Sequence, residues 1–245
     1  RVSVRFYHHG SFFTLSEYLM SEVVAGLDLN RLGRIAEHLE QHYLSPGKLP
    51  CAITLVARQG QVVWQQAQGL MDVERGKPAT ADTLFRIYSM TKPITSVALM
   101  QLYEQGRFLL DEPVHKYIPS WRNLAVYQSG VYPDFVTRPV QRPMTIRDLL
   151  TMSAGLVTDN PWGDRQEAMT REEFAAVLRD GLGHVHRPGT GFEYSNTGYA
   201  LLGRVIDEVT GGDYTGEIRR RFLEPLALGA TGWSAEEIDT AQLAT

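Results

Sequence analysis

The sequence predicts an α/β protein in which an antiparallel sheet flanked by helices precedes a largely helical second lobe. A helix is expected first, because Asp28 is a suitable N-cap and apolar side chains recur at three- and four-residue spacing as far as Tyr43. Two strand-like runs follow, Cys51–Ala57 and Gln61–Ala67, and the turn residues between them indicate a hairpin. The first run is almost wholly apolar, so we expect it to be buried on both faces. After Asp111 the strand signals become scarce.

The helical lobe is predicted from capping residues and apolar periodicity. Thr145-x-x-Asp148 and Thr170-x-x-Glu173 have the form of capping boxes, each opening a helix. We expect helices at about 146–152, 171–180, 198–209 and 214–223. Residues 120–143 are rich in aromatic side chains and are expected to form a long loop, either a binding loop or lid or an ordinary surface excursion.

We expect three parts in the chain: an N-terminal extension over residues 1–27, the first part of the α/β lobe over 28–110, and the mainly helical lobe over 111–245. The extension is too aromatic for a disordered tail and is expected to pack on the body. A two-stranded hairpin is too small a sheet to be stable alone. Further C-terminal strands, missing from this chain, are therefore expected to complete the sheet.

The composition is that of an ordinary soluble globular protein, with 43% hydrophobic and 21% charged residues. A net charge of −4 and the lack of a basic cluster argue against a nucleic-acid partner. The single cysteine, Cys51, excludes an internal disulfide and a multi-cysteine metal site, and its apolar surroundings favour a buried thiol.

No apolar run approaches the roughly 18 residues of a membrane span, so no membrane association is expected. Residues 1–10 lack the apolar region of a signal peptide, which makes a cytoplasmic location the default expectation. The chain does not begin with methionine, so this expectation leaves room for a segment removed earlier. The oligomeric state stays open.

The stretch 84–95 carries the main candidate chemistry. A strand-like run is expected over 84–88, followed by a long helix over about 89–105. Lys92 lies one helical turn after Ser89, so its amine can reach the serine oxygen. A serine hydroxyl is a weak nucleophile until a base takes its proton, and a neutral lysine can act as that base. The amides at the start of the helix would favour an oxyanion.

The spacing alone is weak evidence, because the chain contains a second Ser-x-x-Lys pattern at Ser45 and Lys48. A Pro-Gly pair separates those two residues and marks a turn, so the geometry needed for catalysis is not expected there. Pro93, by contrast, suits the first turn of a helix. It supports a helix that begins at or just before Ser89.

A second informative stretch runs from Arg187 to Asn196 and combines a glycine-rich turn with Tyr194 and Asn196 before a predicted helix. These two residues are two positions apart on extended backbone, so both side chains can enter one cleft. A phenol beside a lysine ammonium loses its proton more readily and can share it with Lys92. The alternative is an aromatic packing residue beside a helix N-cap supplied by Ser195 or Asn196.

Together the two stretches resemble the penicillin-recognising serine hydrolases of the class C β-lactamase and penicillin-binding-protein-like superfamily, and most of all the family VIII carboxylesterases. The similarity runs from about Asp28 to the end of the chain. The phrases that also resemble this family are Leu84–Arg86, Ser89–Thr95, Leu149–Leu156 and Pro188–Thr190. The resemblance implies that Ser89 is the nucleophile, Lys92 and Tyr194 share its proton, and Asn196 contacts Lys92 and the substrate carbonyl. It implies no metal and no organic cofactor.

The sequence departs from this family in one respect. The family has a third motif, Lys-Thr-Gly or a variant with His or Trp, on a strand that edges the site and supplies the second oxyanion donor. The residues after Asn196 read as helices and loop instead. Trp162-Gly163 and His8-His9-Gly10 bear some likeness to the motif but lie before Tyr194, in the wrong order.

We therefore predict a serine hydrolase that cleaves small carboxylic esters through an acyl-enzyme on Ser89. One alternative is a β-lactamase or D-amino-acid peptidase that acts on an amide at the same site, since function resides in the pocket rather than the fold. The other is a non-catalytic binding or scaffold relative. His184 and His186 suggest a triad or metal site less well, because Lys92 already fills the role of base and no acidic partner is identifiable.

Overall fold

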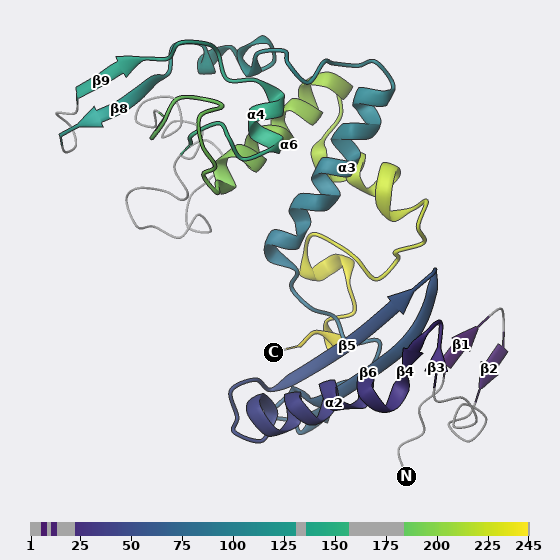
Figure 1. The fold of residues 1–245 in the computed structure, drawn as a ribbon. Helices are drawn as coiled ribbons and strands as arrows, with labels where there is room; N and C mark the ends of the chain where they lie inside the picture. The colour runs from purple at the N-terminus through teal and green to yellow at the C-terminus, as the bar shows by residue number, and fades with distance from the viewer. Residues whose placement is uncertain (1–5, 9–10, 14–22, 131–135, 157–183, 245) are drawn as a thin grey trace. The chain divides into compact units, whose positions relative to one another are not determined.

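The computed structural model describes residues 6–8, 11–13, 23–130, 136–156 and 184–244 (Figure 1). The chain forms two compact units, of which unit 1 comprises Arg1–Arg86 with Ser234–Thr245 and unit 2 comprises Ile87–Trp233. The predicted division at residues 27 and 110 stays a prediction. The predicted helix at 171–180 lies outside the described residues. So do Trp162-Gly163 and His9-Gly10, which bear some likeness to the third motif of the family.

In unit 1 the predicted first helix is α2 (Leu29–Leu39), continued by a π-helical turn over Glu40–Leu44. The Asp28 carboxylate accepts a hydrogen bond from the Arg31 N–H at 3.1 Å, which confirms the predicted N-cap. α2 lies along the hairpin of unit 1 (Figure 1), and the Gln68 side-chain amide donates to the Ala36 carbonyl oxygen at 3.1 Å.

The predicted hairpin is confirmed as β5 (Cys51–Arg58) and β6 (Gln61–Asp72), paired antiparallel with a register shift after Val56. β7 (Lys77–Pro78) pairs with β6, so the sheet order is β5-β6-β7. Gly69 pairs with Cys51 at the open end of the hairpin and has φ +77°. A Cβ at this position would lie 2.3 Å from the Pro50 carbonyl oxygen. Only glycine fits this close approach of two backbones.

Short strand pairs make up the described part of the predicted N-terminal extension. β1 (Phe6–His8) pairs with β2 (Ser11–Phe13), and β3 (Val23–Val24) pairs with β4 (Leu27–Asp28).

Two expectations for unit 1 are wrong. β5 is not buried on both faces, because Leu55 is 56% exposed and Cys51 is the strand's one buried residue. Apolar content does not specify what covers a strand, and no described segment covers Leu55. The run 84–88 is not a strand either: only Leu84 pairs, in an isolated parallel bridge with Leu243. Two short 3-10 turns, Ala235–Glu237 and Thr240–Gln242, precede that bridge partner.

Unit 2 begins with a 3-10 turn over Tyr88–Met90 that leads into α3 (Thr91–Glu104). The predicted helix is therefore present, with its α-helical part starting two residues after Ser89. Pro93 lies in its first turn as expected, where no intrahelical partner for an N–H is required. Gly106 follows the helix at φ +69° and its N–H donates to the Tyr103 carbonyl oxygen at 2.9 Å, which confirms the predicted C-cap region.

The other helices in the described part of unit 2 agree closely with the sequence pattern. They are α4 (Ile146–Leu150), α6 (Asn196–Thr210) and α7 (Tyr214–Ile218), the last continued by a π-helical turn over Arg219–Leu223. Short 3-10 turns occupy Val114–Lys116 and Pro119–Trp121. The capping box of Thr145 and Asp148 is confirmed, because each side chain bonds the other residue's backbone N–H.

A hydrophobic core joins α3, α4 and α6. Its most deeply buried side chains include Leu99, Leu102, Ile146, Leu149, Leu156, Leu202 and Ile206. Burying these apolar side chains supplies the main driving force for fixing the three helices against one another.

The expected long loop at 120–143 is wrong in part, because it contains a second hairpin. β8 (Ala125–Ser129) pairs antiparallel with β9 (Val136–Pro139), and Figure 1 shows this hairpin extending from the helices of unit 2. Trp121 is buried and belongs to the core rather than to a binding surface. Residues 131–135, between the two strands, lie outside the described part. None of the described helices has the length and apolar character needed to cross a bilayer.

Candidate active site

Ser89 lies in the 3-10 turn at the entrance to α3 and its side chain is exposed. The Met90 N–H donates to the Ile87 carbonyl oxygen at 2.9 Å and closes this turn. Tyr88, directly before Ser89, has φ +43°, in the left-handed region that few non-glycine residues adopt. The backbone at the candidate nucleophile is therefore held in a tight and unusual conformation.

Lys92 connects Ser89 to the second stretch that the sequence singled out. Its Nζ donates to Ser89 Oγ at 3.1 Å and to Asn196 Oδ1 at 2.7 Å. The first contact follows from the spacing of one helical turn along the chain. The second joins α3 to the first residue of α6, and it fixes the amine between the two helices.

Tyr194 completes the group of side chains around Ser89. Its hydroxyl lies 2.7 Å from Ser89 Oγ and donates to it, and its ring centroid lies 4.7 Å from Lys92 Nζ. Ser195 is the N-cap of α6, accepting from the Gly198 N–H at 3.2 Å. The helix N-cap that was the alternative interpretation of this stretch is therefore present, and Ser195, between Tyr194 and Asn196, supplies it.

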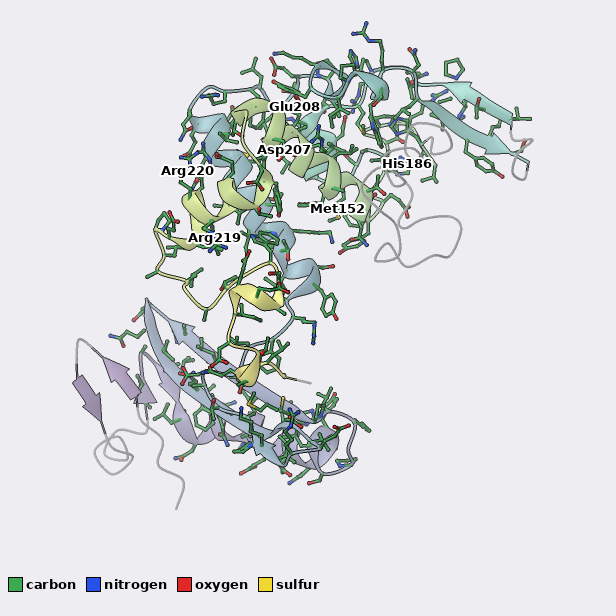
Figure 2. All side chains as sticks on the ribbon, turned by 180° about the vertical axis from the view of Figure 1, so that it is seen from behind. Met152, His186, Asp207, Glu208, Arg219 and Arg220 are labelled. Carbon is green, nitrogen blue, oxygen red and sulfur yellow. The ribbon has the colours of Figure 1, made fainter. Side chains whose placement is uncertain are left out.

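The segment that presents Tyr194 is fastened to the residues after α4 by backbone hydrogen bonds. The Gly189 N–H donates to the Ser153 carbonyl oxygen and the Glu193 N–H donates to the Met152 carbonyl oxygen, both at 2.8 Å. Figure 2 labels Met152 and His186, which lie on the two segments so joined. Because Glu193 directly precedes Tyr194, these bonds fix the backbone position from which the Tyr194 side chain extends.

Asp148, within α4, bonds to residues on both sides of that helix. Its carboxylate accepts from both Nη atoms of Arg142 at 2.6 and 2.8 Å, from the N–H and hydroxyl of Thr145, and from the Ser153 hydroxyl at 3.3 Å. Burial by itself raises the pKa of Asp148, but the hydrogen bonds from Arg142 and Thr145 outweigh burial and bring that pKa below its ordinary value. The aspartate is thus a buried carboxylate that the fold keeps ionised.

The two histidines of the loop contact backbone carbonyl oxygens. His184 is buried, and its Nδ1–H donates to the Ala154 carbonyl oxygen at 2.6 Å. Burial lowers the pKa of His184, so the neutral ring is favoured. His186 Nδ1 lies 3.0 Å from the Arg187 carbonyl oxygen. No described contact joins either ring to Ser89 or Lys92.

The second Ser-x-x-Lys pattern has a different geometry. The Ser45 hydroxyl donates to Glu40 Oε1 at 2.8 Å, and Lys48 Nζ lies 5.7 Å from the centroid of the Tyr43 ring. The two side chains thus have other partners, as the turn between them predicts. Among the described residues, no cluster of His, Cys, Asp and Glu has a composition and spacing suited to holding a metal ion.

Two side chains near Lys92 were not singled out from the sequence. Tyr199 and Ser96 hydrogen-bond to each other at 3.0 Å, and the Tyr199 ring centroid lies 5.8 Å from Lys92 Nζ. Helical spacing places Ser96 one turn beyond Lys92 and Tyr199 one turn beyond Asn196, but it does not show that these two side chains meet across α3 and α6.

A serine, a lysine and a tyrosine joined by hydrogen bonds at the start of a helix, in a protein with antiparallel sheets flanked by helices, define the β-lactamase-like class. The chain belongs to the Beta-lactamase family, whose pattern matches residues 36–245. The resemblance to the class C β-lactamase and penicillin-binding-protein-like superfamily and the fold class expected from the sequence are thereby confirmed.

Among sequence relatives, protein flp of Staphylococcus aureus is 30% identical over 196 residues, which cover 79% of this chain and 36% of that protein. The uncharacterized protein MT1414 of Mycobacterium tuberculosis is 32% identical over 195 residues, covering 76% of this chain and 48% of that protein. The chain thus spans less than half the length of either relative.

Among solved structures, EstCE1 has a TM-score of 0.73 and 27% identity, and it is described as a hydrolase with promiscuous acyltransferase activity. The match covers 88% of this chain and 56% of the EstCE1 chain. The octameric penicillin-binding protein homologue of Pyrococcus abyssi has a TM-score of 0.70 and 30% identity. The match covers 89% of this chain and 47% of the homologue's chain. A class C β-lactamase has a TM-score of 0.69 and 20% identity, and the match covers 90% of this chain and 56% of the β-lactamase chain. At this identity the comparison shows the shared fold.

Proposed function

We propose that this chain carries the nucleophile and base of a serine hydrolase that cleaves carboxylic esters through an acyl-enzyme on Ser89. One observation carries the proposal: Ser89 Oγ lies within hydrogen-bond distance of both Lys92 Nζ, at 3.1 Å, and the Tyr194 hydroxyl, at 2.7 Å. A nucleophile hydrogen-bonded to a candidate base, which a third group orients, is the arrangement that activates a hydroxyl.

In the proposed first step Ser89 Oγ attacks the ester carbonyl carbon while its proton passes to the Lys92–Tyr194 pair. The hydroxyls of Ser89 and Tyr194 can reverse their hydrogen bond by rotation, so the serine becomes the donor before attack. The tetrahedral intermediate then expels the alcohol, which takes a proton from Tyr194. In the second step water, activated by the same pair, attacks the acyl-enzyme and releases the acid.

Asn196 and the helix start have supporting roles in this proposal. Because Asn196 Oδ1 accepts from Lys92 Nζ at 2.7 Å, the amine is held beside the serine instead of sampling its other rotamers. The Ser89 backbone N–H, at the entrance to α3, would donate to the oxyanion as it develops. The amide of Asn196 would also contact the substrate carbonyl.

An ester is favoured over a lactam by the apolar side chains beside the site. Tyr88 and Met90, which flank Ser89, and Phe192, two residues before Tyr194, are each 71% exposed. Large exposed apolar side chains next to a nucleophile suit an apolar acyl or alcohol group. The similarity to EstCE1 supports the same choice.

The proposal is tested by labelling and turnover. A fluorophosphonate probe should react with Ser89, and p-nitrophenyl butyrate should be hydrolysed faster than nitrocefin. Ser89→Ala should abolish labelling and lower kcat/KM by at least about a thousandfold, because the nucleophile is removed.

Ser45→Ala is the matched control, since Ser45 has the same motif spacing without the lysine contact, and it should retain full activity. Turnover of nitrocefin well above that of the ester would favour a β-lactamase instead. An unlabelled Ser89 in the folded protein would favour a binding or scaffold relative.

A further inference from the structure

The helices that carry the site residues are joined by two successive polar contacts. Lys92 Nζ donates to Asn196 Oδ1 at 2.7 Å, and the hydroxyls of Ser96 and Tyr199 hydrogen-bond at 3.0 Å. Ser96 lies one turn beyond Lys92 on α3, and Tyr199 lies one turn beyond Asn196 on α6. The second contact therefore repeats the first one helical turn further along, and together they fix the two helices in register.

Tyr199 also contacts the candidate base directly. Its ring centroid lies 5.8 Å from Lys92 Nζ, so the amine is within reach of two aromatic rings when Tyr194, at 4.7 Å, is included. A cation within about 6 Å of an aromatic face is attracted by the ring quadrupole, more strongly where water is partly excluded. Lys92 and Tyr199 are both half-buried.

The position of the Tyr199 ring does not depend on Lys92. The Tyr199 hydroxyl bonds to Ser96 and also donates to the Leu150 carbonyl oxygen at 3.4 Å, and the residue packs against the core of unit 2. A ring fixed by other contacts can restrict a flexible lysine without itself being displaced.

We propose that Tyr199 is a positioning residue for Lys92: the Tyr199 ring confines the Lys92 amine beside Ser89, and the Tyr199 hydroxyl sets the register of α6 through Ser96. This inference rests on the proposed function for its catalytic consequence, but the Lys92–Tyr199 contact can be measured without any turnover. The ring and the hydroxyl have separable effects, which Tyr199→Phe, Tyr199→Leu and Ser96→Ala distinguish.

The first measurement is the rate at which acetic anhydride modifies Lys92, read by peptide mass spectrometry with Lys48 as internal reference. Acylation requires an accessible amine, so loss of the ring that confines Lys92 in Tyr199→Leu should raise the Lys92 rate by about 2- to 30-fold. Tyr199→Phe and Ser96→Ala keep the ring and should leave this rate within about twofold of wild type.

The second measurement is the fluorophosphonate labelling rate of Ser89 together with ester turnover. Tyr199→Leu should lower labelling and kcat by about 2- to 30-fold with KM unchanged, because Tyr199 contacts the base and not the substrate. Tyr199→Phe should restore most of that loss. A general disturbance of the fold would not be rescued by restoring the ring alone in Tyr199→Phe.

Tyr103→Leu serves as the control for losing a tyrosine ring on α3, since the Tyr103 ring packs on Phe108 at 6.0 Å. It should change neither rate. Should Tyr199→Leu fail to fold, Tyr199→Met removes the aromatic face while keeping an apolar side chain of adequate length.

An unchanged Lys92 acetylation rate in the folded Leu or Met variant would overturn the proposal. So would faster acetylation with unaltered Ser89 labelling, because the ring would then have no part in the reaction. If acetylation rises but wild-type Ser89 is never labelled, the proposed function fails while the Lys92–Tyr199 contact stands.

Discussion

Tyr88 has a backbone conformation that costs free energy, one residue before the candidate nucleophile. At φ +43° a non-glycine residue incurs about 1–3 kcal/mol of strain, and a β-branched residue incurs more. Tyr88→Val should therefore lower the free energy of unfolding by about 1–3 kcal/mol, whereas Tyr88→Gly should leave it unchanged or raise it. Urea unfolding followed by circular dichroism measures the difference.

Tyr88→Phe is the control for the loss of the phenol and should match the wild type. Equal stability of the Val and Gly variants would show that the turn relaxes to an unstrained conformation.

The placement of the candidate site side chains could be predicted from the sequence where it depends on local spacing. Ser89 and Lys92 come together because they are one turn apart on a helix, and the turn before α6 allowed Tyr194 and Asn196 to be placed in the same cleft. Tyr199 was not found, because its relation to Lys92 depends on how α6 packs across α3. Spacing within one helix does not determine packing between two.

At the scale of elements, the buried Asp148 joins α4 to Arg142, which precedes the helix, and to Ser153, which follows it. Breaking a buried charge pair leaves an uncompensated charge. Asp148→Asn should lower the free energy of unfolding by about 2–4 kcal/mol, because Arg142 loses its carboxylate partner and the capping box is disturbed. Thermal unfolding at neutral pH measures this loss.

Asp111→Asn is the matched control, since Asp111 pairs with Arg147 at 2.7 Å but both side chains are at least half exposed. Exposed ion pairs contribute little, so this variant should unfold like the wild type. Equal losses in the two variants would mean that Asp148 acts only as one surface charge among others.

Helices were predictable at this scale and strands less so. The caps at Asp28, Thr145 and Ser195 mark helix starts in the sequence because each bonds the backbone N–H three residues further on. The β8–β9 hairpin escaped notice, since its strands are short and largely exposed, so no alternation between buried and exposed residues marks them. The exposure of Leu55 was missed for a related reason: what covers a strand is not encoded in that strand.

For the whole molecule, His184 makes stability depend on pH near neutrality. Burial lowers the pKa of His184 in the folded state, so as the pH falls below the ordinary histidine value the unfolded chain binds a proton that the folded chain does not. Acidification from pH 7.5 to 5.5 should thus destabilise the protein, by at most about 1.4 kcal/mol per pH unit from this residue. Above pH 7.5 the effect should vanish.

Urea midpoints at the two pH values check this prediction. His184→Asn, whose amide can still donate to the Ala154 carbonyl oxygen, should lose less stability on acidification than the wild type. His38→Asn, on the exposed side of α2, should retain the full pH dependence. An Asn variant at His184 with the wild-type dependence would assign the effect to other groups.

The pairing of Leu84 with Leu243 has a consequence for the order in which the protein takes shape. The Leu84 N–H donates to the Gln242 carbonyl oxygen at 2.8 Å, and the Leu84 carbonyl oxygen accepts from the Ala244 N–H at 2.9 Å. Unit 2 is one continuous stretch inserted between the two segments of unit 1. During synthesis on the ribosome, the candidate site residues Ser89, Lys92, Tyr194 and Asn196 therefore emerge before Ser234–Thr245 and can assemble before that segment joins unit 1. The candidate site can thus form while part of the hairpin unit, which begins earlier in the sequence, is still to be made.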